Sequence, residues 1–228
     1  VVGVVEDLLV QSETLEENYR LTMELGRLLS EIPSKRVRAL QCFNEAAEMA
    51  PEEIDPLREL SALLLEGTDW ARLVDVLERE FDLEESPIEK ARVGAKLGRV
   101  LSTHLRKYGE ALDYLRMAVS LDSSHGPAVE GLEMLLENPE LRDRVALTLE
   151  THYESVGQWD EAVRVLETQR RSTRDTDEIV ACTERIVRLQ REELHAPLKA
   201  ARTWVQSVRM GVPFSRIRDY AEELASKE

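Results

Sequence analysis

The chain has 228 residues, of which 43% are hydrophobic and 33% are charged, so it can bury a sizeable apolar core. Its formal net charge of −15 argues against a nucleic-acid groove or binding to an anionic membrane surface, because both need a basic surface. No run of about 18 apolar residues occurs, so we expect no membrane insertion, and no signal-peptide pattern opens the chain. We therefore expect protein partners of basic or mixed charge, no nucleic acid, and a cytoplasmic rather than an exported location.

The residues that usually form catalytic or metal sites are scattered. Cys42 and Cys182 lie far apart and lack metal-ligand spacing, which favours two reduced thiols on helices. The four histidines are His104, His125, His152 and His195. No two of them are three or four residues apart, and neither a glycine-rich phosphate loop nor a nucleophile elbow occurs. We therefore expect no metal, no cofactor and no enzymatic activity.

The prolines mark the ends of predicted helices. All eight fall where the apolar pattern places a helix break, and none interrupts a periodic segment. They are Pro33, Pro51, Pro56, Pro87, Pro127, Pro139, Pro197 and Pro213. Since no sustained two-residue alternation occurs either, the sequence predicts an all-α protein of short helices joined by tight turns.

Apolar residues three and four positions apart predict a series of about 12–13 amphipathic helices. In chain order the predicted helices cover 1–10, 13–30, 35–50, 56–66, 69–82, 87–104, 107–121, 127–137, 139–156, 159–171, 176–194, 197–210 and 213–228. Thr14 and Glu17 have the spacing of a capping box at the start of the second helix.

The same order of residues recurs along the chain. The segment 25–30 reads Leu-Gly-Arg-Leu-Leu-Ser, and the segment 97–102, which lies 72 positions later, reads Leu-Gly-Arg-Val-Leu-Ser. A second shift, of 89 positions, aligns Trp70 with Trp159 and Ala111 with Ala200. Internal repeats that each contain two amphipathic helices indicate an α-helical solenoid.

The two shifts differ by about one helix, which indicates that one helix near 139–156 is duplicated. We therefore predict an irregular crossing or a bend near 138–158. The match at a shift of 72 begins at the first residue, so the chain opens inside a repeat and without an initiator methionine. We interpret it as a piece of a longer protein, and the excess of arginine over lysine is typical of a GC-rich bacterial source.

Two copies of the repeat share a pattern of small and large residues. The matching positions are Leu25, Gly26, Leu29, Ala39, Phe43, Ala46 and Pro51 in the first copy and Leu97, Gly98, Leu101, Ala111, Leu115 and Ala118 in the second. Partial matches are Tyr153, Ala162 and Leu166, and Ala200 with Trp204. This pattern resembles the tetratricopeptide repeat (TPR), in a degenerate form with one residue inserted between the glycine and the first alanine.

The resemblance implies a right-handed α-α superhelix of antiparallel hairpins, a single array over 1–228. Its first helices would line a concave groove for an extended peptide or a partner helix. Apart from Pro51, the matching residues are predicted to pack the repeat, because glycine inside a helix costs about 1 kcal/mol relative to alanine unless it serves a close contact. Trp70 and Trp159 are predicted to be packing anchors in the same way.

Six arginines on first helices would face such a groove. They are Arg20, Arg27, Arg92, Arg99, Arg188 and Arg191. Because a guanidinium group forks onto carboxylates, this arginine ladder could bind an acidic peptide. The alternative is pairing on helix surfaces with nearby carboxylates, namely Glu24, Glu89, Glu184 and Glu192. The family's clamps for chaperone tails use lysine and asparagine, and Met23 and Ala95 stand at matching places, which disfavours a clamp.

We interpret the chain as a non-catalytic scaffold for protein–protein interaction. One alternative is a substrate-recognition, effector-recognition or regulatory module of a larger enzyme or signalling protein, which the sequence on either side would reveal. The other alternative is a purely structural spacer, which would bind nothing in a pull-down.

Overall fold

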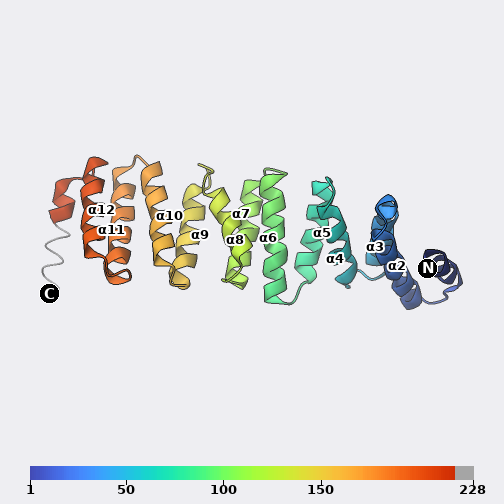
Figure 1. Cartoon of the computed structure of the whole chain (residues 1–228). Helices are drawn as coiled ribbons and strands as arrows, with labels where there is room; N and C mark the ends of the chain where they lie inside the picture. The colour runs from blue at the N-terminus through green and yellow to red at the C-terminus, as the bar shows by residue number, and fades with distance from the viewer. Residues whose placement is uncertain (219–228) are drawn as a thin grey trace. The chain divides into compact units, whose positions relative to one another are not determined.

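The computed structural model describes residues 1–218, in which all regular secondary structure is helical (Figure 1). The α-helices are α1 (Val2–Gln11), α2 (Leu15–Ser30), α3 (Arg36–Met49), α4 (Asp55–Leu65), α5 (Trp70–Leu83), α6 (Pro87–Thr103), α7 (Tyr108–Leu121), α8 (Gly126–Leu135), α9 (Arg142–Ser155), α10 (Trp159–Ser172), α11 (Thr176–Glu192) and α12 (Pro197–Arg209), and a 3₁₀-helix (Pro33–Lys35) precedes α3. Each α-helix corresponds to a predicted helix, so the all-α helical-repeat fold is confirmed. Residues 214–218 are helical too, and the rest of the predicted helix 213–228 lies outside the described residues.

The chain divides into two compact units, Val1–Gly131 and Leu132–Glu228. Within each unit a helix packs mainly on the helices that precede and follow it in the sequence (Figure 1). The most extensive contacts of the first unit join α2 with α3 and α6 with α7. In the second unit α10 packs as extensively on α11 as on α9, and α11 packs to the same extent on α12. The units are thus built from TPR-like hairpins, while the single array and the irregularity near 138–158 stay predictions.

Glycines let paired helices approach closely. A Cβ at Gly26 of α2 would lie 2.6 Å from the Phe43 ring of α3, and a Cβ at Gly98 of α6 would lie even closer to Leu115 of α7. Each glycine therefore leaves the space that a large side chain of the second helix fills. Leu115 also faces Gly131 of α8, where a Cβ would lie 2.7 Å from its Cδ2. One leucine thus fills the space beside two glycines, of which the repeat pattern indicated only Gly98.

The residues predicted to pack the repeat are all buried. They are Leu25, Gly26, Leu29, Ala39, Phe43, Ala46, Leu97, Gly98, Leu101, Ala111, Leu115, Ala118, Tyr153, Ala162, Leu166, Ala200 and Trp204. Of the other tryptophans, Trp70 is half-buried and stacks on His104 with ring centroids 3.7 Å apart. Leucine-to-alanine changes in such a core cost about 2–5 kcal/mol, so these positions carry much of the stability.

The residue inserted between glycine and alanine is accommodated in the hairpin turns. After α6, Arg106 adopts the left-handed conformation (φ 55°), and the next amide donates to a carbonyl six residues earlier at 2.9 Å. The turn after α11 repeats this arrangement, with φ 48° at His195 and an equivalent bond of 2.7 Å. Such turns satisfy carbonyls at the helix end. The turn after α2 instead uses the 3₁₀-helix Pro33–Lys35.

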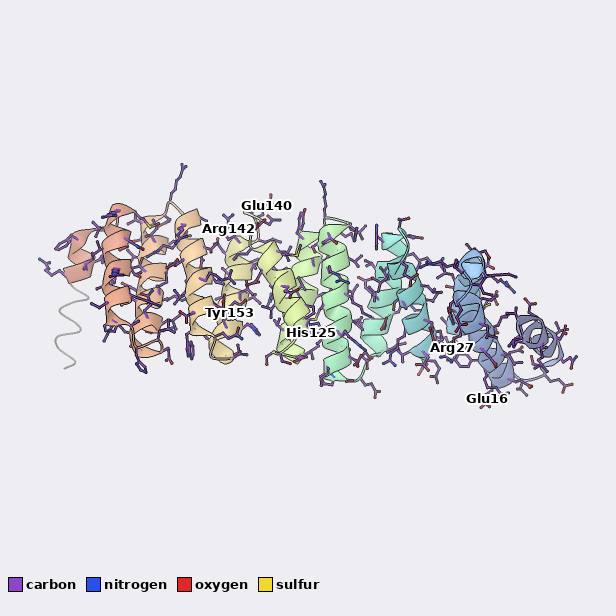
Figure 2. The ribbon with its side chains drawn as sticks, viewed as in Figure 1. Glu16, Arg27, His125, Glu140, Arg142 and Tyr153 are labelled. Atoms are coloured by element: carbon purple, nitrogen blue, oxygen red, sulfur yellow. The ribbon has the colours of Figure 1, made fainter. Side chains whose placement is uncertain are left out.

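The start of α9 differs from the prediction. We expect a helix from residue 139, whereas α9 begins at Arg142. The Asn138 side chain accepts a hydrogen bond from the Glu140 amide at 3.0 Å, and the Arg142 guanidinium donates to the Leu136 carbonyl at 3.3 Å. Figure 2 shows Glu140 and Arg142 at this turn. Local side-chain bonds to the backbone compete with helix formation and account for the later start.

The core of the second unit contains polar side chains at repeat positions where the first unit has an apolar side chain or a glycine. At a shift of 89 positions, Arg170 of α10 corresponds to Phe81 of α5, and Thr183 of α11 corresponds to Gly94 of α6. Arg170 is 2% exposed, and its Nε and Nη1 have no hydrogen-bond partner among the described residues. Thr183 is fully buried and donates to the Ile179 carbonyl at 2.6 Å.

Candidate partner-binding surface

A hollow of about 300 Å³ lies on the first unit beside α2 and the start of α4. It is lined by Tyr19, Arg20, Met23, Glu24 and Arg27 of α2 and by Asp55 of α4. Met23 is buried and Tyr19 is half-buried, whereas Arg20 and Glu24 are exposed. The hollow therefore combines a small apolar area with charges of both signs.

Arg27, labelled in Figure 2, lines this hollow and joins α2 to α4. Its Nε donates to Oε1 of Glu59 at 2.7 Å, and the two side chains are 55% and 34% exposed. The hydrogen bond to Glu59 raises the pKa of Arg27, so the guanidinium stays charged throughout the physiological range. Because the Arg27 guanidinium is already paired with Glu59, Arg27 contributes to the contact between α2 and α4 more than to a free binding surface.

Two other predicted groove arginines also have carboxylate partners. Arg92 contacts Glu89 on its own helix, which is the surface pairing given as the alternative to a ladder. Arg188 of α11 lies 3.6 Å from Glu154 of α9 and so joins two helices. The pairing that links two helices, seen at Arg27 and Arg188, was not among the expectations from the sequence.

The remaining arginines of the predicted ladder are Arg20, Arg99 and Arg191. Arg191 is half-buried on α11. Arg20 and Arg99 are exposed, and neither forms an ion pair with any residue in the described part of the chain. Of these two, Arg20 is the one that lines a hollow, which makes it the arginine best placed to meet an external carboxylate.

A buried carboxylate in the second unit escaped the sequence reasoning. Glu150 of α9 is 1% exposed and forms an ion pair with Arg185 of α11. Burial raises the pKa of Glu150, although the positive charge of Arg185 opposes the shift. The pair joins positions 35 residues apart, so only knowledge of which helices become neighbours could have revealed it.

Tyrosine hydroxyls make a second kind of link between helices. Tyr114 of α7 donates to Glu78 of α5 at 3.1 Å, and burial together with this bond raises the pKa of Tyr114 to about 12. Tyr153 of α9, labelled in Figure 2, donates to Glu133 of α8 at 2.8 Å, and Glu133 also contacts Arg164 of α10. These bonds fix the register of helices in each unit and leave the phenols protonated at neutral pH.

The described residues show no grouping of three or more His, Cys, Asp or Glu side chains that could hold a metal ion. Cys42 and Cys182 are buried and not joined in a disulfide, and burial raises the pKa of both thiols. Among the same residues, none of the helices has the length and apolar character needed to cross a membrane. What stands out chemically is therefore the charged hollow beside α2.

Comparison with known proteins gives distant structural similarities only. No protein-family model and no curated protein matches the chain. Among solved structures, a MamA protein is 14% identical, with 86% of this chain and 92% of that chain covered and a TM-score of 0.45. MamA 41-end from Desulfovibrio magneticus RS-1 is 14% identical (85% and 94% covered, TM-score 0.39), and Pseudomonas aeruginosa pilF is 16% identical (92% and 100% covered, TM-score 0.37).

The hairpins themselves define the class of protein. Their buried Leu-Gly and Ala positions recur in register and bring the two helices of each pair together. The chain is thus an all-α helical-repeat protein with TPR-like hairpins.

Proposed function

We propose that the chain is a non-catalytic protein-interaction scaffold, and that the hollow beside α2 and α4 binds an extended peptide or a helix of a partner protein. The observation that carries the proposal is Arg20. Its guanidinium is exposed at a concave place and has no ion-pair partner among the described residues. A carboxylate of the partner can therefore pair with it without displacing an internal contact.

The other lining residues suit the same kind of ligand. Met23 and Tyr19 offer an apolar contact for one partner side chain. Glu24 and Asp55 can accept hydrogen bonds from a basic side chain or from backbone amides of the partner. The hollow thus favours a ligand of mixed charge that places a carboxylate at Arg20.

The test begins with selection of peptide ligands from a random display library on the 228-residue chain. The tightest peptide is then titrated by calorimetry against the wild-type chain and the Arg20→Glu variant. We expect Arg20→Glu to weaken binding by about tenfold or more, because it replaces an attraction with a repulsion. The helical melt should stay nearly unchanged, since Arg20 is exposed.

Arg174→Glu is the matched control. Arg174 is exposed in the turn between α10 and α11, and its reversal changes the net charge by the same amount. Binding by this variant should stay within about twofold of the wild type. Equal losses in the two variants, or a selected peptide that binds both as well as the wild type, would refute a site at Arg20. Failure to select any peptide would favour the structural spacer.

A further inference from the structure

The two ends of the described chain carry opposite charge. Residues 194–218 contain five basic side chains and no Asp or Glu, although the whole chain has a net charge of −15. The basic residues are Lys199, Arg202, Arg209, Arg216 and Arg218. Residues 1–19 contain five acidic side chains and no Lys or Arg, and these are Glu6, Asp7, Glu13, Glu16 and Glu17.

Helix α12 presents an apolar stripe inside the basic segment. Leu198 is 77% exposed and Val205 is 59% exposed, and Ala201 lies between them on the same helical face. A shallow hollow of about 380 Å³ lies over this face, lined by Leu198, Ala201, Arg202, Val205, Gln206 and Arg209. The opposite face packs in the core through Ala200 and Trp204. The small Ala201 between two larger apolar residues gives the stripe its shallow shape.

Helix α1 presents an apolar stripe of the same spacing inside the acidic segment. Val4 and Leu8 of α1, and Val1 directly before it, are 62%, 47% and 86% exposed. They stand at positions i+3, i+7 and i, the spacing of Ala201, Val205 and Leu198 of α12. Asp7 lies beside Val4, three positions further along the helix, whereas Glu6 lies on the other side of the helix. Only Val5 of α1 is buried, so most of this helix is open to a contact.

We propose that the apolar stripe of α12 in one copy of the chain binds the apolar stripe of α1 in a second copy. The two stripes match in length, about 10 Å each, and Arg202 and Arg209 beside the α12 stripe would face Asp7 beside the α1 stripe. The contact joins two different surfaces, so it leaves one free α1 and one free α12 and can add further copies. The surface is separate from the hollow at Arg20 and does not depend on it.

Sedimentation equilibrium of the whole chain tests this contact. The buried area is small, so we expect the average mass to rise above that of the monomer over about 10–500 μM. Raising the salt from about 0.05 to 0.5 M should reduce the association, because the charges beside the stripes are exposed. A wild-type chain that stays monomeric over this range would overturn the proposal.

Mixing two variants distinguishes this contact from a symmetric one. Val205→Glu removes the α12 stripe, and Leu8→Glu removes the α1 stripe. Each variant alone should be monomeric, while an equimolar mixture should form dimers and nothing larger, because one intact stripe of each kind remains. A mixture that stays monomeric, or a variant that associates as the wild type does, would contradict the pairing of α12 with α1.

Leu147→Glu is the control, because Leu147 of α9 is 58% exposed, almost the same as Val205. This variant should associate as the wild type does, and circular dichroism should show full helical content in all three variants. The main competitor for a basic apolar helix is a lipid surface. If the chain binds vesicles of equal parts phosphatidylcholine and phosphatidylglycerol through Val205 and does not self-associate, the α12 stripe is a membrane contact and the proposal is wrong.

Discussion

Arg170 carries a positive charge into the core of the second unit. Its side chain stands where the first unit has Phe81, and two of its nitrogens have no hydrogen-bond partner among the described residues. Burial lowers its pKa, which reflects the cost of removing the guanidinium from water. The second unit thus places a charged side chain in the core where the first unit has an aromatic one.

Replacing Arg170 by methionine should stabilise the protein. The long apolar side chain keeps most of the buried volume and removes the desolvated charge, so we expect a gain of about 1–3 kcal/mol. Thermal and urea unfolding followed by circular dichroism measure the change. Arg171→Met, on the exposed neighbour that pairs with Glu167, should change stability by less than about 0.5 kcal/mol. A clear loss of stability in Arg170→Met would mean that the guanidinium has a stabilising partner.

Glu150 and Glu84 are two buried carboxylates whose pKa values move in opposite directions. Burial raises the pKa of Glu150 despite its ion pair with Arg185. Burial also acts to raise the pKa of Glu84, but the hydrogen bond and charge of Arg58 and the Ser86 amide outweigh it and lower that pKa. The fold thus favours the protonated form at one site and the ionised form at the other.

Unfolding as a function of pH should therefore separate Glu150→Gln from Glu84→Gln. Relative to Glu150→Gln, the wild type is most stable below pH 4.5 and loses this advantage as the pH rises through the raised pKa, because the folded state holds the proton more tightly. Relative to Glu84→Gln, the advantage is present above pH 4.5 and is lost as the pH falls through the lowered pKa. Urea titrations between about pH 3 and 7 measure both, and slopes of the same sign would contradict the assignment.

The close packing of paired helices depends on glycines at the positions where the two helices contact each other. A Cβ on Gly98 would overlap Leu115, so Gly98→Ala should destabilise the chain by about 1–3 kcal/mol. Gly109 of α7 has open space around the same position, so Gly109→Ala should instead stabilise it by about 0.5–1 kcal/mol. Urea unfolding checks both signs. Similar effects in the two variants would mean that helix propensity, and not the close contact, decides the result.

The elements could be predicted from the sequence because their causes are local. The spacing of apolar residues, three and four apart, determines where the helices lie. The eight prolines mark where the helices begin or end, and both signals act within a few residues. The start of α9 was missed because the Asn138 and Arg142 side chains compete with the backbone at that turn. The pairing of Arg92 with Glu89 on one helix could be predicted. Partners on another helix could not, because a pair such as Arg27 with Glu59 depends on which helices become neighbours.

At the scale of the whole molecule, helices within each unit contact chiefly their neighbours in the sequence. Such chains gain stability locally, and helices with few buried residues open first. Only Val5 of α1 is buried, whereas α6 buries residues along most of its length. Within the first unit, α1 should therefore open locally more often than α6.

Hydrogen exchange measured by mass spectrometry should show this gradient. We expect amides of α1 to exchange fastest and those of α6 and α7 slowest in the first unit, because exchange follows the free energy of local opening. The measurement belongs at about 1 μM, far below the concentrations at which the proposed contact between copies would protect α1. Uniform protection over residues 1–131 would show that the unit opens as a single cooperative block.

Leu115 fills the space beside both Gly98 and Gly131, and this has a consequence for how such chains diverge. A larger residue at either glycine fits without loss of stability only after position 115 has become smaller, and a small residue at 115 relieves the steric constraint on both glycines at once. Among homologous sequences, positions 98, 115 and 131 should therefore covary, while the residues around them vary independently.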